Sequence, residues 1–259
     1  MAAVAIALGL LIGASLGLLG GGGSILTVPI FVYVLGFPPK EAIAMSLAVV
    51  GATSLVGVAG HWRAGNVNLR TGATFGAVAM VGTFAGTRLA AFLSGTTQLA
   101  IFGVVMLVAA TFMFRGRRAP DASGGRRRGA ATTLVVLGGL AVGLLTGLVG
   151  VGGGFLIVPA LVLLALPMRE AVGTSLLIIA TNCAVGVAGY LGHIQFTWNS
   201  MALVTAGTLP GIALGTYLHR FVSQDALRRG FAVFLLLVAG FILYQNIGTV
   251  LAAVAHRSS

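Results

Sequence analysis

Apolar stretches long enough to cross a lipid bilayer recur along the whole chain. A spanning helix needs about 20 apolar residues, because each residue adds about 1.5 Å to a helix and the hydrocarbon core is about 30 Å thick. The predicted spans are residues 3–20, 41–62, 71–93, 98–114, 132–150, 170–191, 199–221 and 229–250. Two further apolar segments, 24–36 and 154–166, follow glycine clusters and are too short to span comfortably. The sequence therefore predicts an all-α fold, a polytopic helical membrane protein.

The charged residues support a membrane protein and argue against a nucleic-acid-binding one. Of the 259 residues, 58% are hydrophobic and only 7% are charged, whereas a soluble domain has about 25% charged residues. The net charge of +11 comes largely from one short segment, which holds Arg115, Arg117, Arg118, Arg126, Arg127 and Arg128. Such clusters beside membrane helices set orientation and contact anionic headgroups. We therefore expect the lipid bilayer, and no nucleic acid, as a partner.

The two halves of the chain repeat one another at an offset of about 130 residues. GLLGGGGSILTVP, from Gly17 to Pro29, recurs as GLVGVGGGFLIVP from Gly147 to Pro159. One residue is then lost, and KEAIAMSL at 40–47 matches REAVGTSL at 169–176, an offset of 129. We predict two membrane repeats, residues 1–114 and 132–259, joined by an arginine-rich linker at 115–131.

The basic residues favour an inverted arrangement of these repeats. If each glycine-broken segment crosses the membrane once, nine basic residues lie on the linker side and five on the other. If each segment instead turns back as a re-entrant hairpin, the second repeat is inverted and the split becomes twelve to two, with Arg88 excluded as intramembrane. Because positive charge collects in cytoplasmic loops, we predict inverted repeats with the linker in the cytoplasm.

A cluster of glycines interrupts apolar sequence in each half, at 20–23 and 152–154. Irregular backbone survives inside a bilayer only within protein or beside a water-filled cavity, and paired broken elements are typical of a transporter's binding site. Helices that restart near such breaks present free N–H groups and partial positive charge to an anion. The predicted anion-binding residues are Gly20, Gly22, Gly23, Ser24, Gly150, Gly152, Gly153 and Gly154. Close helix packing is the alternative, and we prefer it for the ladders Gly9-Gly13-Gly17 and Gly139-Gly143-Gly147.

Polar side chains within the spans extend this candidate site. Ser46 and Ser175 are repeat partners, and seven residues later Thr53 is the partner of Asn182. Their hydroxyl and amide groups suit an oxyanion, although hydrogen bonds between helices explain them equally well. Arg88 lies near one end of its span, where it either attracts anions or extends to the interface. The sequence leaves both alternatives open.

Other chemistries find little support in the residues. Glu41 and Glu170 follow prolines and are expected to stabilise helix N-termini, with proton coupling as the alternative. His61 and His193 are expected at the interface without clustered ligands, so neither a metal site nor a cofactor is predicted. The glycine clusters lack the lysine of a phosphate-binding loop, and no catalytic constellation is discernible. We therefore expect a protein that is not an enzyme.

The paired motif GGGGSILTVP/GVGGGFLIVP, followed by P-x-[KR]-E-A and S-L, resembles the sulfite exporter TauE/SafE family of membrane permeases. The resemblance covers nearly the whole chain and implies transport of small sulfur-containing anions, such as sulfite or organosulfonates, usually as export across the bacterial inner membrane. It implies a role for the two motifs, Gly20 to Ser24 and Gly150 to Gly154. One position departs from the pairing, because Gly154 stands where the first motif has Ser24.

The resulting hypothesis is an inner-membrane exporter of a small sulfur-containing anion, which binds between the broken helices of the two repeats and moves by alternating access. A permease or channel for another small anion or metabolite, and a membrane scaffold subunit without transport, are the alternatives. Neither the anion, the coupling ion nor the oligomeric state, homo-oligomers included, follows from the sequence.

Overall fold

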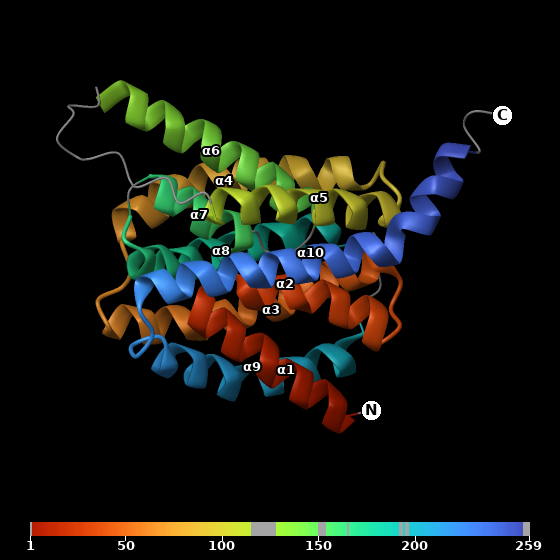
Figure 1. Cartoon of the computed structure of the whole chain (residues 1–259), viewed down its shortest axis with the longest axis horizontal. Helices are drawn as coiled ribbons and strands as arrows, with labels where there is room; N and C mark the ends of the chain where they lie inside the picture. Colours follow the sequence, from red (N-terminus) through yellow and green to blue (C-terminus); the bar gives the residue numbers. More distant parts are fainter. Residues whose placement is uncertain are drawn as a thin grey trace.

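The computed structural model describes residues 2–114, 128–149, 154–164, 166–191, 194 and 197–255, and this part of the chain contains helices and no strand. The helices lie side by side along one long direction (Figure 1). Their bounds are α1 (Ala2–Leu19), α2 (Gly22–Pro29), the π-helix η1 (Ile30–Val34), α3 (Pro39–Arg63), α4 (Leu69–Ala90), α5 (Gly95–Phe114), α6 (Arg128–Val149), α7 (Gly154–Leu163), α8 (Met168–Tyr190), α9 (Trp198–Leu218) and α10 (Gln224–Ala255). The predicted all-α fold is confirmed. Residues 115–127 of the predicted linker lie outside the described residues, and 128–131 belong to α6.

Local sequence explains where several helices begin. Pro38 and Pro39 start α3, and proline fits a first turn because the missing N–H has no partner there anyway. Asn68 caps α4 by accepting a hydrogen bond from the Thr71 N–H at 3.1 Å. Glu41 and Glu170 lie in the first turns of α3 and α8, as predicted, where the helix dipole favours a carboxylate.

Four helical segments of the described chain are long and apolar enough to cross a membrane: Pro39–Arg63, Met168–Tyr190, Trp198–Leu218 and Asp225–Gln245. Four shorter apolar segments accompany them: Ala3–Leu19, Gly23–Val34, Gly95–Thr111 and Val135–Val149. The eight predicted spans are therefore helices, but only half of them are both long and apolar enough to count as spanning helices. The predicted span at 71–93 corresponds to α4, a 22-residue helix that is in neither group.

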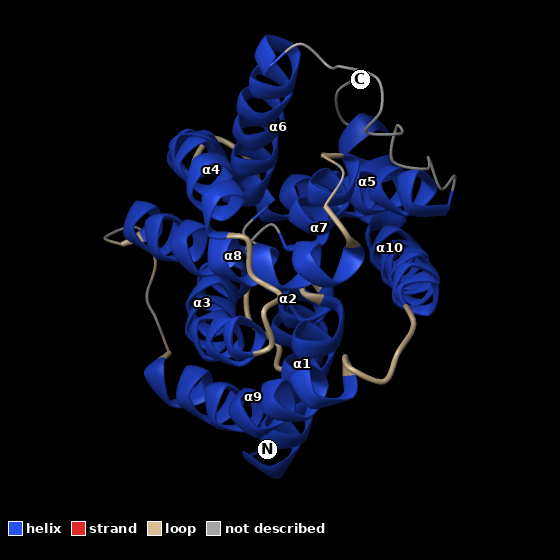
Figure 2. Cartoon of the chain, turned by 90° about the vertical axis from the view of Figure 1, so that its left-hand side faces the viewer, coloured by secondary structure: helices blue, strands red, loops and turns tan. Residues whose placement is uncertain are grey.

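The two helices that follow the glycine clusters lie in the middle of the bundle. Figure 2 looks along the helices and shows α2 and α7 at its centre, with the longer helices around them. Contacts agree, because α2 packs against α1, α3 and α10 while α7 packs against α8 and α5, and the two touch each other. Ile25 of α2 and Ile157 of α7 are fully buried. Two short helices that could not span alone thus form the centre of the fold.

The first glycine cluster folds the chain back on itself. Gly20 has φ +72°, a left-handed conformation that favours glycine, and its N–H closes α1 on the Leu16 carbonyl at 2.8 Å. Beyond the break, a Cβ on Gly23 would overlap the carbonyl oxygen of Ile12. In an uninterrupted helix residues 12 and 23 would be about 16 Å apart along the axis. The first break is therefore a hairpin, as predicted, and not a continuous helix.

The glycine ladders pack helices together, as expected. A Cβ on Gly13 of α1 would overlap the carbonyl oxygen of Thr208 in α9, and a Cβ on Gly143 of α6 would overlap that of Ala79 in α4. Gly13 and Gly143 are repeat partners, and Ala79 and Thr208 are partners at the 129-residue offset. The first helix of each half thus packs closely, through equivalent glycines, on a helix of the other half.

Helices α3 and α8, which are equivalent in the two halves, pack against each other in opposite directions. A Cβ on Gly57 would lie 3.1 Å from Leu176 Cδ1, and one on Gly186 would lie 3.0 Å from Leu47 Cδ1. Residue numbers fall along α8 as they rise along α3, so the pair is antiparallel.

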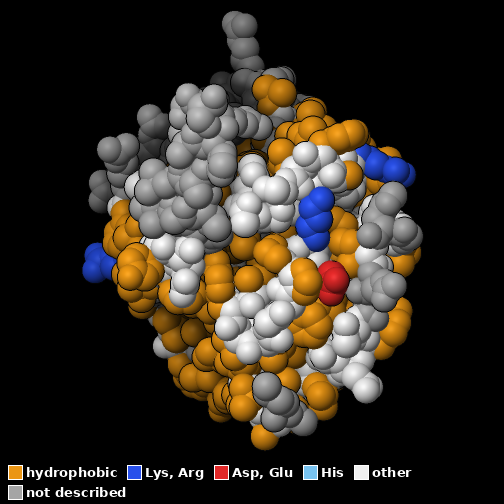
Figure 3. All heavy atoms as spheres, turned by 90° about the vertical axis from the view of Figure 1, so that its right-hand side faces the viewer, with side chains coloured by type: hydrophobic (Ala, Val, Ile, Leu, Met, Phe, Trp, Pro, Cys, Tyr) orange, Lys and Arg blue, Asp and Glu red, His pale blue; other side chains and the backbone are white. Residues whose placement is uncertain are grey.

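Large apolar side chains also cover the outside of the bundle. Val81, Leu137 and Leu237 each expose more than half of their surface. Figure 3 shows the end of the bundle at the right of Figure 1, where apolar side chains are interspersed with backbone and other side chains and a few charged side chains are visible. An apolar exterior over a helical bundle is the surface expected against lipid.

Candidate functional site

The start of α7 meets the first glycine break inside the bundle. A Cβ on Gly154, the first residue of α7, would lie 2.8 Å from Gly21 Cα and 3.2 Å from Ser24 Oγ. Gly22 begins α2, directly after Gly21, its N-terminal cap. Residues 20–24 and 154 are thus brought together, whereas Gly150, Gly152 and Gly153 lie outside the described residues.

Several predicted oxyanion donors are engaged in hydrogen bonds with the protein itself. Ser24 Oγ donates to the Gly21 carbonyl at 2.7 Å. Ser46 Oγ donates to Ile43 O at 2.8 Å within α3. Ser175 Oγ lies 2.7 Å from Val172 O and 3.2 Å from Gly20 O, so this hydroxyl reaches the first break. All three serines are fully buried.

Thr53 and Asn182, repeat partners seven residues further along, differ in their surroundings. Thr53 Oγ1 donates to Val49 O at 2.7 Å and is 2.6 Å from Thr208 Oγ1, so it joins α3 to α9. This contact is the hydrogen bond between helices that the sequence left as an alternative. Asn182 is fully buried in α8, and neither its amide nitrogen nor its amide oxygen has a hydrogen-bond partner. An unpaired buried amide is costly, so Asn182 is the predicted site residue best placed to receive a polar ligand.

Arg88 is not brought to the breaks. Its side chain is exposed in the last turn of α4, with its guanidinium 5.1 Å from the centre of the Phe84 ring. This placement fits a side chain that extends to the interface, because a long arginine can leave its charged end in water.

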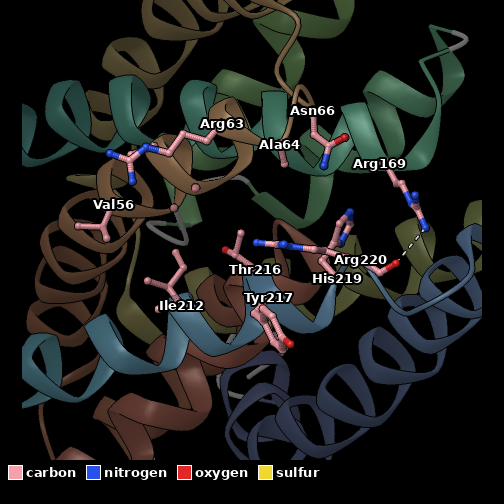
Figure 4. Close-up of a pocket in the computed structure, with 14 residues that line it drawn as sticks. Val56, Arg63, Ala64, Asn66, Arg169, Ile212, Thr216, Tyr217, His219 and Arg220 are labelled. Carbon is pink, nitrogen blue, oxygen red and sulfur yellow. Dashed lines mark hydrogen bonds between the residues drawn. The ribbon is translucent and has the colours of Figure 1, made fainter.

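A cavity of about 750 Å³ opens at the end of the bundle where α3 and α9 finish. Its lining comes from the last turns of α3, the loop to α4, the start of α8 and the end of α9. Three arginines and a histidine take part, namely Arg63, Arg169, Arg220 and His219, and no carboxylate is among the lining residues (Figure 4). A concave site with three positive charges and no compensating carboxylate attracts anions.

The arginines of the cavity are held by neutral groups of the protein. Arg169 Nη2 donates to the backbone oxygen of Arg220 at 3.3 Å, drawn as the dashed line in Figure 4. The Arg220 guanidinium lies over the Tyr217 ring, 5.3 Å from its centre. Neither contact neutralises a charge, so both guanidinium groups keep their positive field. In the sequence, Arg63, Arg169 and Arg220 are three of the basic residues whose distribution predicts the orientation of the repeats. Their shared position at span ends on one predicted side was the signal that could have found the cavity.

A carbonyl near the end of the first helix in each half, α1 and α6, is bonded by a side chain from an equivalent position of the chain. His61 Nε2 is 3.0 Å from the Gly17 carbonyl oxygen, and the Tyr190 hydroxyl donates to the Gly147 carbonyl at 3.2 Å. His61 and Tyr190 are partners at the 129-residue offset, and Gly17 and Gly147 are partners at 130. His61, expected at the interface, is therefore fully buried, because it satisfies a carbonyl at a helix end. Among the described residues, no group of three or more potential metal ligands gathers at any point.

Comparison with known proteins gives this arrangement a family. Curated relatives that cover most of the chain are called probable membrane transporter proteins. One from Xylella fastidiosa (strain 9a5c) is 34% identical over 96% of this chain and 97% of its own length. YdhB from Bacillus subtilis (strain 168) is 27% identical over 90% of this chain and 96% of its own length. No solved structure matches the chain.

The family described as "Sulfite exporter TauE/SafE" matches residues 5–242, nearly the full length. This match and the relatives agree with the apolar helices and the broken segments at the centre of the bundle. The chain is therefore a multi-pass membrane transporter that belongs to the TauE/SafE family.

Proposed function

We propose that the protein exports a small sulfur-containing anion, such as sulfite or an organosulfonate, from the cytoplasm across the inner membrane. The observation that carries the proposal is the cavity lined by Arg63, Arg169 and Arg220 without a carboxylate. Such a site admits an anion and repels cations. The family description supplies the sulfur chemistry.

The direction of transport follows from the position of the arginines. Loops rich in arginine stay in the cytoplasm, so the cavity is the cytoplasmic entrance. An inside-negative potential moves one negative charge outward with about 2.3 kcal/mol per 100 mV, which is more than tenfold in concentration. Export therefore needs no ATP.

Alternating access is the proposed mechanism, and two contacts support it. The antiparallel packing of α3 on α8 fits repeats of opposite orientation, which exchange roles when the protein changes state. Equivalent pairs of helices are also separated by different distances at the two ends of the bundle. A Cβ on Gly60 would lie 3.7 Å from Thr216 Cβ beside the cavity, whereas one on its partner Gly189 would lie 2.9 Å from Thr87 Cβ. The helices are further apart at the cavity end, as expected of a state open to the cytoplasm.

From the cavity, the anion would pass to the point where the start of α7 meets the first glycine break. There the starts of α2 and α7 would present N–H groups, and Asn182, about one helical turn along α8 from the Ile179 that packs against Gly154, would supply an unpaired amide. The anion would exchange its hydration water for these backbone and amide donors, so its charge would not be exposed to lipid.

Counterflow in proteoliposomes tests this function. Labelled sulfite and methanesulfonate are offered with and without an imposed potential, and outward flux should rise when the loaded side is negative. Replacing Arg63 and Arg169 by glutamine should reduce flux at least about tenfold, since each removes a charge at the entrance. Arg88→Gln is the matched control, because Arg88 is exposed on α4 and outside the cavity. Absence of any potential-dependent anion flux would refute the proposal.

A further inference from the structure

Two histidines meet beside the cavity, and one of them, His219, lines it. His61 in the last turn of α3 and His219 directly after α9 have ring centres 5.0 Å apart, in an edge-to-face arrangement. His61 Nε2 is 3.0 Å from Gly17 O, and His219 Nδ1 is 2.8 Å from Leu18 O. Both carbonyls belong to the last turn of α1, immediately before the first glycine cluster. The pair is thus attached to the element whose break forms the centre of the transporter.

The carbonyl partners determine where the protons are. A carbonyl oxygen only accepts, so His61 Nε2 and His219 Nδ1 must each carry a hydrogen. In neutral imidazoles the other nitrogens, His61 Nδ1 and His219 Nε2, are then unprotonated acceptors. Both are buried and neither has a hydrogen-bond partner. The pair therefore offers free proton-accepting nitrogens next to a positively charged cavity that His219 itself lines.

Burial and the neighbouring positive charge disfavour protonation of His219 while the cavity is empty. The cavity groups around it are Arg63 of α3, Arg169 of α8, and Tyr217 and Arg220 at the end of α9. The described residues of α1 contribute no titratable side chain. Burial lowers the pKa of His219, the Leu18 carbonyl raises it, and the positive charge of Arg169 lowers it. An anion between Arg169 and His219 would offset that charge, and the protonated imidazole would donate to it.

We propose that His61 and His219 form a proton site that fills together with the anion. When an oxyanion enters the cavity, one proton passes from water to Nε2 of His219, which then donates to an anion oxygen. The proton returns to the cytoplasmic water when the anion leaves the cavity for the interior of the bundle, so the charge that crosses the membrane is that of the anion alone. A second proton on His61 is disfavoured, because two imidazolium groups at this distance repel each other beside three arginines. The inference rests on the proposed anion transport and adds to it a proton that is bound at the entrance while the anion occupies the cavity.

The other half of the chain supplies a matched substitution. Tyr190, the repeat partner of His61, donates its hydroxyl to Gly147 O and has no imidazole, and the partner of His219 is Ala90. The proton site therefore belongs to one end only. His61→Tyr preserves a donor to Gly17 O and removes the titrating ring. His219→Asn places its amide nitrogen near the position of Nδ1, so it also preserves the bond to α1 without a second titrating nitrogen.

The test measures anion binding and proton uptake together on the purified full-length protein. The probes are sulfite and methanesulfonate, the second of which does not titrate near neutrality. Wild-type affinity should rise by up to about tenfold per unit fall in pH between about pH 8 and pH 5, with up to one proton taken up per anion. The His61→Tyr/His219→Asn double variant should bind with an affinity that does not change with pH, and the proton uptake should disappear.

The outcomes separate the inference from the proposed function. Anion binding by the wild type without proton uptake overturns the proton site and leaves anion transport intact. Proton uptake that persists in the double variant also overturns it, because the proton then goes elsewhere. If the wild type binds neither probe and carries neither in proteoliposomes, the proposed function fails and the proton site fails with it. The wild-type proton count decides the question even if the double variant does not fold.

Discussion

Gly154 at the start of α7 packs against Gly21 at the end of the first glycine cluster, so that a Cβ on Gly154 would lie 2.8 Å from Gly21 Cα. Two segments that are 133 positions apart in the printed sequence thus touch at the centre of the bundle. The contact requires two residues without side chains, which explains why each half carries glycine at its break.

Gly154→Val should strongly reduce transport because its side chain would force the start of α7 away from the first glycine break. Overpacking of this kind costs about 1–3 kcal/mol, and the same energy on a transport barrier slows flux by about five- to 150-fold. Counterflow in proteoliposomes measures the loss. Gly240→Val in α10 is the control, since nothing lies within 4 Å of a Cβ there. Full activity of Gly154→Val, with the control also active, would show that the contact is not needed.

Gly13→Ala should lower stability, because its methyl group would overlap the Thr208 carbonyl. We expect a loss of about 1–3 kcal/mol in the free energy of unfolding. Gly143→Ala, at the equivalent position of the second half, should cost a similar amount. Thermal unfolding in detergent makes the comparison. Gly240→Ala should be neutral or stabilising by up to about 1 kcal/mol, and equal melting temperatures for all three variants would contradict the packing role.

Asn182→Leu should leave the protein at least as stable while reducing transport. The substitution removes a buried amide that has no hydrogen-bond partner, whose desolvation costs about 1–3 kcal/mol. Thr53→Val provides the contrast, since it breaks the bond to Thr208 and should destabilise the protein. Melting temperature and flux are measured on both variants. A destabilised Asn182→Leu protein with normal flux would assign Asn182 to structure alone.

Cysteine labelling should place the cavity on the cytoplasmic side. Asn66→Cys lines the cavity, and Lys40→Cys is exposed at the start of α3. An impermeant maleimide should label Lys40→Cys in right-side-out vesicles and Asn66→Cys in inverted vesicles. The native Cys183 is buried and should not react, which makes the wild type the blank. The reverse pattern would invert the proposed topology and the direction of entry.

Local sequence predicted the elements well because helix formation in a membrane depends on short-range composition. The predicted spans at 41–62 and 170–191 became α3 and α8, which differ from them by at most two residues at either end. The predicted hairpin at 20–23 formed because Gly20 adopts φ +72°. The expected span at 71–93 forms a helix that is long enough to cross a membrane. It is not counted among the spanning helices because it is less apolar: Arg70, Arg88 and several threonines and glycines lie in or beside it.

The candidate site was predictable only in part. The two glycine motifs and Asn182 could be selected from the sequence because a broken backbone and an amide are costly in lipid, and their part in anion binding stays a prediction. The roles of Ser24 and Thr53 stay open, although their hydroxyls bond to Gly21 and to Val49 and Thr208. His219 was missed altogether, because a single histidine near a helix end has no pattern in the sequence.

The sequence by itself determined the membrane environment, the helices, the repeat and the breaks, since each depends on residues close together along the chain. Tertiary structure decided that Arg63, Arg169 and Arg220 surround one cavity and that His61 and His219 share the end of α1. These groups come from helices far apart in the chain. Their meeting depends on which helix faces pack together, which the glycine ladders and the antiparallel α3–α8 pair establish only in the folded bundle.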